Sequence, residues 1–219
     1  MVMKESMEQP PTAQLSRDEQ ILAYFVRKCG SKKPLGRTQL VKLAYLVDHE
    51  ARRYLGRPLS DLNYYWHFFG PYDDEILTTI HSLQDKDIIR EEQVVYPTGQ
   101  KGYEYKKGTE DEIRVSLQPI EIEILRYVCT TYADLKLSAL LGDVVYETAP
   151  MKAAIAAGAK GEPLDMNVVN DERRFEYGIS FEELFDRIQE VRAGRGIPHA
   201  KAVAELRASI VDNAGVVAA

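Results

Sequence analysis

The chain has 219 residues, 45% of them hydrophobic and 28% charged, which is the composition of an ordinary globular protein and excludes collagen-like or wholly disordered chains. A formal net charge of −6 argues against a protein coated in nucleic acid, although it leaves room for a local basic patch. No apolar run approaches the roughly 20 residues of a membrane helix, the first residues lack the apolar stretch of a signal peptide, and two cysteines are too few for a disulfide framework. We therefore expect a cytoplasmic protein without membrane contact whose cysteines are reduced.

The first predicted element is a helix that follows a loose tail. Residues 1–15 are expected to form a flexible tail, and Ser16 with Glu19 has the spacing of a capping box. Apolar residues at helical spacing then predict a helix that ends at Cys29. Gly30 stands where a left-handed residue closes a helix, and Cys29 falls on the apolar face as a core cysteine.

A second helix, an aromatic strand and a third helix follow. The second helix begins after residues 34–36 and ends at Gly56-Arg57-Pro58. The segment 63–69 is rich in aromatic residues and predicts a strand that ends at Gly70-Pro71. The carboxylates of residues 73–75 then open a third helix, where they suit the positive end of the helix dipole.

The second half of the chain predicts a hairpin followed by helices. Two short strands flank the glycine-bearing turn at 97–102, and Pro119 starts a fourth helix. A fifth helix is expected over 137–146, and the glycine-containing stretch 153–170 is expected to be a loop with at most one helical turn. A second capping box at Ser180 opens a short helix.

This order of elements predicts a mainly α-helical α+β protein with a small antiparallel sheet. The run of helix, helix, strand, helix and hairpin is also the order of a winged helix-turn-helix, so the first part is expected to be winged-helix-like. We expect one domain over residues 16–192, followed by a C-terminal helix and flexible tail over 193–219.

The sequence lacks the known constellations of catalytic residues. His49-Glu50 begins like a zinc-protease helix, but Arg53 stands where the second histidine ligand is required. The cysteines lack the spacing of a zinc or redox site, and neither a phosphate-binding loop nor a nucleophile elbow occurs. We therefore expect no enzymatic activity, no catalytic residue, no metal and no cofactor.

A basic stretch between residues 27 and 57 is a candidate nucleic-acid surface. Its proposed members are Lys32, Lys33, Arg37, Arg52 and Arg53. The helix that would enter the DNA groove, however, begins with the carboxylates of residues 73–75, which would meet a polyanion. We predict at most weak, salt-sensitive DNA binding without sequence preference, and a winged-helix DNA-binding transcriptional regulator remains the alternative function.

The aromatic strand offers a second candidate surface. Alternation along a strand sends about half of its side chains into the core, and the outward half can anchor a protein partner because tyrosine and tryptophan carry interface energy. The candidate partner-binding residues are Tyr65, Trp66, Gly70, Pro71 and Tyr72.

Several motifs, taken in order, resemble the SocA-type antitoxin domain, which is also called the Panacea domain. They are residues 35–46, Gly56-Arg-Pro-Leu59, the aromatic strand running into Gly70-Pro71, Leu137–Leu140 and Tyr146–Pro150. The resemblance covers about residues 18–155. The resemblance implies an antitoxin of a bacterial or phage toxin–antitoxin system that neutralises a cognate toxin by direct binding, without metal or cofactor. The family includes adaptors that deliver the toxin to a protease.

The C-terminal residues fit the adaptor mode. The chain finishes in small apolar residues with Ala218-Ala219 at its end, which resembles the tags that bacterial AAA+ proteases of the ClpXP type engage. A tail of this composition has too little side-chain area to dock firmly, so it is expected to fray. An AAA+ protease is therefore an expected second partner.

Overall fold

A computed structural model describes residues 14–30, 33–96, 99–110, 115–169 and 180–195. The chain divides into two compact units, residues 1–52 with 57–170 and residues 53–56 with 171–219. Within the described residues no helix is long and apolar enough to cross a membrane. The predicted tail at 1–15 lies almost wholly outside the described residues, as does 196–219, which holds most of the predicted C-terminal helix and tail.

The fold is mainly helical with two small antiparallel sheets, as the sequence predicts. The elements are α1 (Arg17–Tyr24), the π-helix η1 (Phe25–Cys29), β1 (Leu35–Gly36), α2 (Arg37–Leu55), β2 (Tyr65–His67), β3 (Gly70–Tyr72), α3 (Glu75–Asp85), β4 (Ile89–Val95), β5 (Lys101–Lys107), α4 (Pro119–Tyr132), α5 (Leu137–Ala139), the π-helix η2 (Leu140–Val145), α6 (Ala149–Ala157), the 3-10 helix η3 (Met166–Val168) and α7 (Phe181–Arg192). One sheet has the order β1-β5-β4 and the other pairs β2 with β3.

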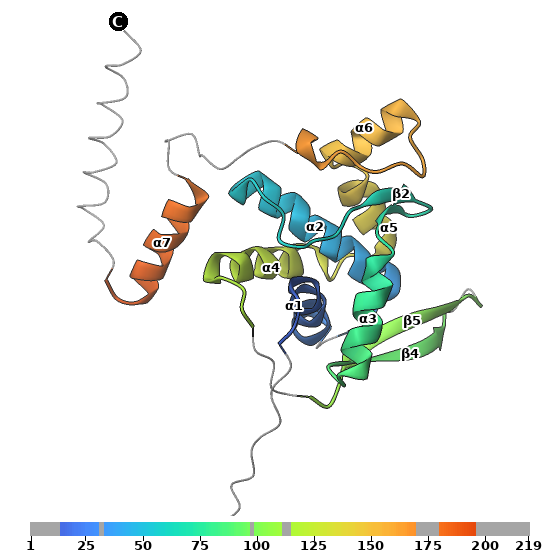
Figure 1. The fold of residues 1–219 in the computed structure, drawn as a ribbon, viewed down its shortest axis with the longest axis horizontal. Coiled ribbons are helices and arrows are strands. Elements are labelled where there is room, and N and C mark those ends of the chain that lie inside the picture. Colours follow the sequence, from blue (N-terminus) through green and yellow to red (C-terminus); the bar gives the residue numbers. More distant parts are fainter. Residues whose placement is uncertain (1–13, 31–32, 97–98, 111–114, 170–179, 196–219) are drawn as a thin grey trace, which may run out of the picture. The chain divides into compact units, whose positions relative to one another are not determined.

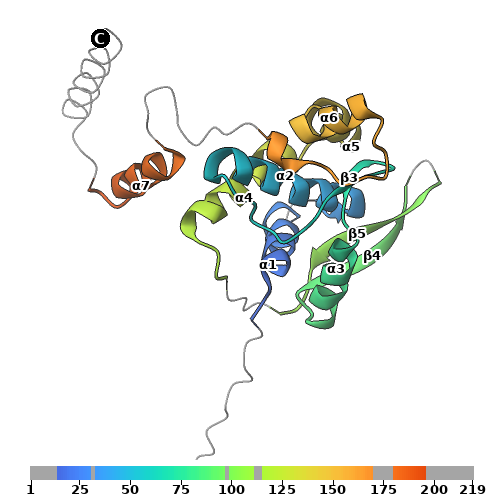
Figure 2. The same cartoon turned by 45° about the horizontal axis from the view of Figure 1, so that its top comes forward.

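Helix α1 lies between α3 and α4, and the β4–β5 hairpin extends beyond α3 (Figures 1 and 2). The helical spacing of apolar residues explains this packing. Ile21, Leu22 and Phe25 are almost fully buried, as are Leu40, Leu43 and Val47 of α2. Burying side chains of this size stabilises the fold by about 1.5–3 kcal/mol each relative to exposure.

The predicted capping box at the start of α1 is confirmed and reaches another helix. The Ser16 hydroxyl accepts from the Glu19 N–H at 3.1 Å, and the Glu19 carboxylate accepts from the Ser16 N–H at 2.8 Å. The same carboxylate accepts from the Ser82 hydroxyl at 2.7 Å and pairs with Lys86, so it joins α1 to α3. Burial opposes ionisation of Glu19, but these hydrogen bonds outweigh it and lower its pKa.

The end of the first helix differs from the prediction in its conformation. Gly30 is not left-handed, since its φ is −70° and its ψ is −2°. The last turn is a π-helix in which the Gly30 N–H donates to the Phe25 carbonyl at 3.0 Å. A Cβ on Gly30 would lie 2.4 Å from the Val26 carbonyl oxygen, so the close approach of the backbone, and not a left-handed φ, requires glycine here.

The two cysteines form a disulfide, which corrects the expectation that both are reduced and that Cys29 is a core thiol. Cys29 ends η1 and Cys129 lies in α4, and the packing of these two elements brings their Cα atoms to 5.8 Å. That distance is the usual one for a disulfide. The sequence contains no local signal of this proximity, because the two cysteines are 100 positions apart.

Two further segments differ from the sequence expectation. The aromatic stretch is a hairpin and not one strand, because Gly70-Pro71-Tyr72 returns alongside residues 65–67. For the stretch 153–170 the sequence predicts a loop with at most one helical turn, but α6 extends to Ala157 and η3 follows over 166–168. Alanine is the strongest helix former, so the small residues of this stretch favour a helix, which Gly158 ends with a φ of +63°.

The described part of the second unit contains α7. Its capping box is confirmed, because the Glu183 N–H donates to the Ser180 hydroxyl at 3.1 Å and the Ser180 N–H donates to the Glu183 carboxylate at 2.7 Å. Glu182 and Glu183 occupy its first turn and Arg192 its last, in agreement with the helix dipole.

Candidate partner-binding site

Helix α2 carries three buried polar side chains, spaced three residues apart, that hold the surrounding segments in place. Lys42 donates from Nζ to the Pro71 carbonyl at 2.6 Å. The Tyr45 hydroxyl lies 2.7 Å from Oγ1 of Thr148, which precedes α6. These contacts explain why the motif in α2, the Gly-Pro corner and the motif near residue 148 occur together in the sequence.

The third of these side chains, Asp48, organises the turn after α2. Its Oδ1 accepts from the N–H groups of Leu59 and Ser60, each at 2.8 Å. Its Oδ2 accepts from the hydroxyls of Ser60 and Tyr64, the latter at 3.0 Å. Burial raises the pKa of Asp48 above its ordinary value, and these hydrogen bonds limit the rise.

Gly70 and Pro71 form a buried corner next to the tip of the β2–β3 hairpin. Because the corner is packed in the core, it fixes the position of the hairpin. Gly70 has a φ of +89°, a conformation that favours glycine. A Cβ at this position would lie 3.4 Å from Cγ1 of Val145, so η2 packs closely against the corner. Gly70 and Pro71, both predicted to touch a partner, are core residues that fix where the hairpin tip stands.

The tip of the β2–β3 hairpin consists of Phe68 and Phe69. Their side chains are 70% and 61% exposed, whereas two-residue hairpin loops ordinarily use Asn, Asp and Gly. The left-handed Gly70 follows them and lets both phenylalanines keep negative φ values. Since neither burial nor turn chemistry requires two phenylalanines here, the tip is the strongest indication of a contact surface.

The rest of the hairpin supports this tip. The rings of Tyr65, His67 and Tyr72 lie together on one face, with centroids 5.1 to 5.8 Å apart. Trp66 is held through its backbone: its N–H donates to the Glu162 carbonyl at 3.0 Å, and its own carbonyl accepts from the Gly161 N–H at 2.8 Å. Tyr65, Trp66 and Tyr72 are half-buried, so the structure brings the predicted aromatic residues together beneath a more exposed tip.

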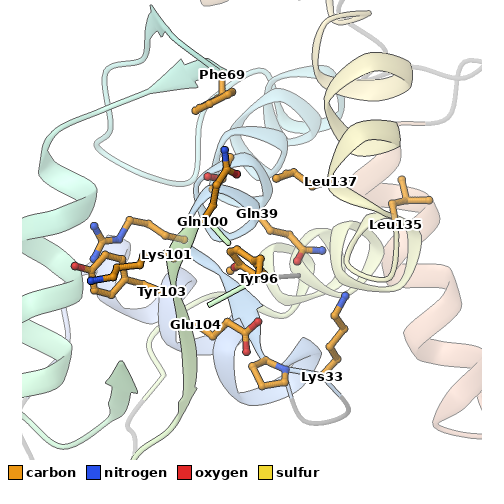
Figure 3. A pocket seen from close by; sticks show the side chains of 15 residues that line it. Lys33, Gln39, Phe69, Tyr96, Gln100, Lys101, Tyr103, Glu104, Leu135 and Leu137 are labelled. Carbon is orange, nitrogen blue, oxygen red and sulfur yellow. The ribbon is translucent and has the colours of Figure 1, made fainter. Parts of the chain in front are cut away.

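A groove of about 790 Å³ lies beside the tip (Figure 3). One wall is the hairpin β4–β5, the floor is the start of α2, and the opposite wall is the connection from α4 to α5. Figure 3 shows Phe69 at one end, Lys33 at the other, and Leu135 and Leu137 across from Tyr96. The groove is therefore lined by segments that are far apart in the sequence.

Arg37 fixes the hairpin wall of this groove. Its guanidinium donates to the Glu91 carboxylate at 2.7 Å and to the Tyr105 hydroxyl at 2.9 Å, and it lies 4.0 Å above the Tyr103 ring. The Tyr105 hydroxyl also donates to Glu91 at 2.7 Å. Burial disfavours the charged form of Arg37, but the bonds to Glu91 and Tyr105 outweigh it and raise its pKa.

The predicted basic patch is not one continuous cluster of side chains. Lys32 lies outside the described residues, while Lys33 and Arg37 line the groove. Arg52 is 15 positions along α2 from Arg37, roughly 22 Å at the helical rise, and its Nε is buried without a hydrogen-bond partner among the described residues. Arg53 lies 5.2 Å above the ring of Tyr54.

We expect DNA binding to be weak, because the basic side chains do not form one continuous cluster. Tested against DNA from its own promoter at 0.15 M salt, the protein should bind no more tightly than about 10⁻⁵ M and should not distinguish that DNA from a random duplex. Lys33→Glu should weaken this binding further, because it removes a phosphate contact. Fluorescence anisotropy over a salt series measures both effects, and nanomolar, sequence-selective binding would contradict the expectation.

The partner-binding residues predicted from the sequence do not include Phe68 and Phe69, which are among the most exposed large hydrophobic residues that the structure describes. Phe68 and Phe69 belong to the aromatic stretch, but the stretch was treated as one strand, whereas the exposed pair occupies a turn. The signal that could have found them is the glycine after two aromatic residues, which permits a turn at that point. The groove had no signal, since four separate segments build it.

The geometry describes a helical domain that presents an aromatic hairpin tip beside a basic groove, and the described residues contain no cluster of histidine, cysteine and carboxylate side chains that could hold a metal ion. Residues 40–146 match the family model described as "Antitoxin SocA-like, Panacea domain". This part of the chain is therefore similar to the family that the sequence motifs resemble, over a narrower range than the resemblance predicted. No curated protein and no solved structure gives a significant match.

Proposed function

We propose that this protein is an antitoxin that neutralises a cognate toxin by direct binding, and that the tip residues Phe68 and Phe69 are the main anchors. The observation that carries the proposal is the exposure of both side chains, at 70% and 61%, on a hairpin that a buried corner holds in place. The family whose model matches residues 40–146 supports the antitoxin role. Exposed aromatic anchors of this kind dominate the binding energy of protein interfaces.

The predicted aromatic residues have supporting places in this proposal. Tyr65 and Tyr72 flank the tip and extend the contact face, whereas Gly70 and Pro71 position the tip from the core. The antitoxin needs no metal, cofactor or catalytic residue for this role, and it acts in the cytoplasm. Delivery of the bound toxin to an AAA+ protease is the second mode of neutralisation that the resemblance to the family implies.

The double substitution Phe68→Ser with Phe69→Ser is expected to abolish protection against the toxin while the fold is kept. Each open reading frame beside this gene is first expressed alone to identify one that stops growth, and it is then co-expressed with the antitoxin variants. Loss of two aromatic anchors should weaken binding by about 2 kcal/mol or more, which is roughly 30-fold. Growth and the dissociation constant of the purified pair are measured.

Ile155→Ser is the matched control, because Ile155 is also an exposed apolar residue, at 44%, but lies on α6. It should protect as well as the unsubstituted chain, and circular dichroism should show all variants folded. If no neighbouring frame is toxic, the antitoxin function fails. If the double variant still protects fully, the contact surface lies elsewhere.

A further inference from the structure

The central strand of the three-stranded sheet is only partly covered on its groove side. β1 pairs with β5 at two positions, Leu35 with Tyr105 and Gly36 with Glu104, and the chain then turns into α2. Among the residues that the structure describes, no strand continues this pairing along residues 101–103. β5 therefore keeps an open edge at this end, and the groove lies directly along it.

The backbone groups of this edge are directed toward the groove. A Cβ on Gly36 would lie 3.9 Å from the Tyr103 carbonyl oxygen, so this carbonyl faces the side on which β1 lies. Backbone groups of alternate residues point to the same side of a strand, so those of Lys101 share this direction. An extended chain lying in the groove would find donors and acceptors at the spacing of a strand.

The two faces of this edge differ in chemistry. Figure 3 shows Lys101 and Tyr103 on one side of β5, and Tyr96 and Glu104 on the other. The first side also holds Arg37, above the Tyr103 ring and paired with Glu91, so Lys101 carries the positive charge of this side that Glu91 does not balance. The second side combines Tyr96 with the leucines of the opposite wall and is mainly apolar, with Lys33 at its end.

We propose that the groove binds an extended segment of a partner protein, which adds to the open edge of β5 as a strand and alternates acidic with apolar side chains. Side chains of a strand point alternately to opposite faces. The acidic ones would therefore meet Lys101, and the apolar ones would meet Tyr96 and Leu137. Phe69 closes one end of the groove, so the segment and the hairpin tip belong to one contact surface.

The outer edge of β4 is the competing position, but no residue of β4 lines the groove. The carboxylates at the centre of β4 are already paired, Glu91 with Arg37 and Glu92 with Lys106. The groove is lined by Lys33 and Lys101 against the one carboxylate of Glu104, while Glu91 balances the charge of Arg37. An acidic segment therefore complements the groove along β5.

The test uses a library of random twelve-residue peptides displayed on phage and selected on the immobilised full-length protein. Selected peptides should be rich in Asp and Glu at alternate positions. As free synthetic peptides they should bind at least tenfold more weakly to the double variant Lys33→Glu with Lys101→Glu. Arg90→Glu is the matched control, since Arg90 is an exposed cation of β4 outside the groove lining, and it should leave the affinity unchanged.

A second measurement separates strand addition from side-chain binding alone. Methylation of alternate backbone nitrogens of a selected peptide should abolish binding for one of the two registers and spare the other, because only one set of N–H groups faces β5. Failure to select any peptide, selected peptides without an acidic excess, equal binding to the charge-reversed variant, or indifference to both methylation patterns would each overturn the proposal.

A second copy of the chain is the other possible occupant of the edge. A dimer at micromolar concentration that Lys101→Glu dissolves, measured by light scattering, would assign the edge to self-association and overturn the proposal. The inference deepens the proposed antitoxin function, but the peptide assay needs no toxin. If peptides bind but no neighbouring open reading frame is toxic, only the proposed antitoxin function is refuted. If the protein neutralises a toxin but no peptide binds, only the proposed peptide-binding groove is refuted.

Discussion

Replacing Asp48 with alanine is expected to lower the free energy of unfolding by about 4 kcal/mol, because several buried donors lose their acceptor at once. The N–H groups of Leu59 and Ser60 and the hydroxyl of Tyr64 all donate to this carboxylate. Each buried donor left without a partner costs about 1–3 kcal/mol. Urea unfolding followed by circular dichroism measures the change.

Two comparison variants separate hydrogen bonding from charge. Asp48→Asn keeps an oxygen for the two backbone donors, and the hydroxyls of Ser60 and Tyr64 can turn to accept from its amide, so a clearly smaller loss is expected. Asp85→Ala removes an exposed carboxylate of α3 and should change the stability by less than about 0.5 kcal/mol. An Asp48→Ala variant as stable as Asp85→Ala would contradict the assigned role.

The stability of the protein is expected to rise between pH 7 and pH 9 because of Lys42. Burial lowers the pKa of Lys42 to about 7 from an ordinary value of 10.5, so the folded state releases a proton that the unfolded state still binds. Stability rises with pH wherever the unfolded state binds more protons, and this one group should contribute about 2 kcal/mol over these two pH units.

Lys42→Met isolates this contribution. Methionine fills a similar volume without a titratable group, so the unsubstituted protein should gain about 2 kcal/mol relative to the variant from pH 7 to pH 9. The measurement is urea unfolding of both proteins at pH 7, 8 and 9. Lys152→Met, at an exposed lysine of α6, serves as the control, and its difference from the unsubstituted protein should stay constant. Equal pH slopes with and without Lys42 would refute the expectation.

Much of the fold follows from local patterns. α2, α3 and α4 were predicted because their apolar residues recur at helical spacing and their ends carry the expected signals, such as Pro119 at the start of α4. The capping boxes at Ser16 and Ser180 were found for the same reason. Such signals depend only on residues within one or two turns, so a single sequence contains them.

The features that the sequence did not predict depend on distant residues. The π-helical turns η1 and η2 pack against elements that are distant in the sequence, η1 against α4 and η2 against β3. The Cys29–Cys129 pair and the groove arise only when separate segments meet. For the candidate site, the sequence predicts the aromatic stretch but not its turn, and therefore not the exposure of Phe68 and Phe69.

The disulfide also determines how the chain would respond to mechanical tension. A pull applied at the two chain ends passes through the covalent bond between Cys29 and Cys129, so the intervening segment carries no load. With a sequence separation of 100, this shields roughly 350 Å of contour length at about 3.5 Å per residue. Helix α2, both hairpins and the groove edge of β5 lie inside the shielded segment, whereas α6 and α7 lie outside it. In an optical trap, the fully stretched chain should therefore lengthen by about that amount when a reductant is added.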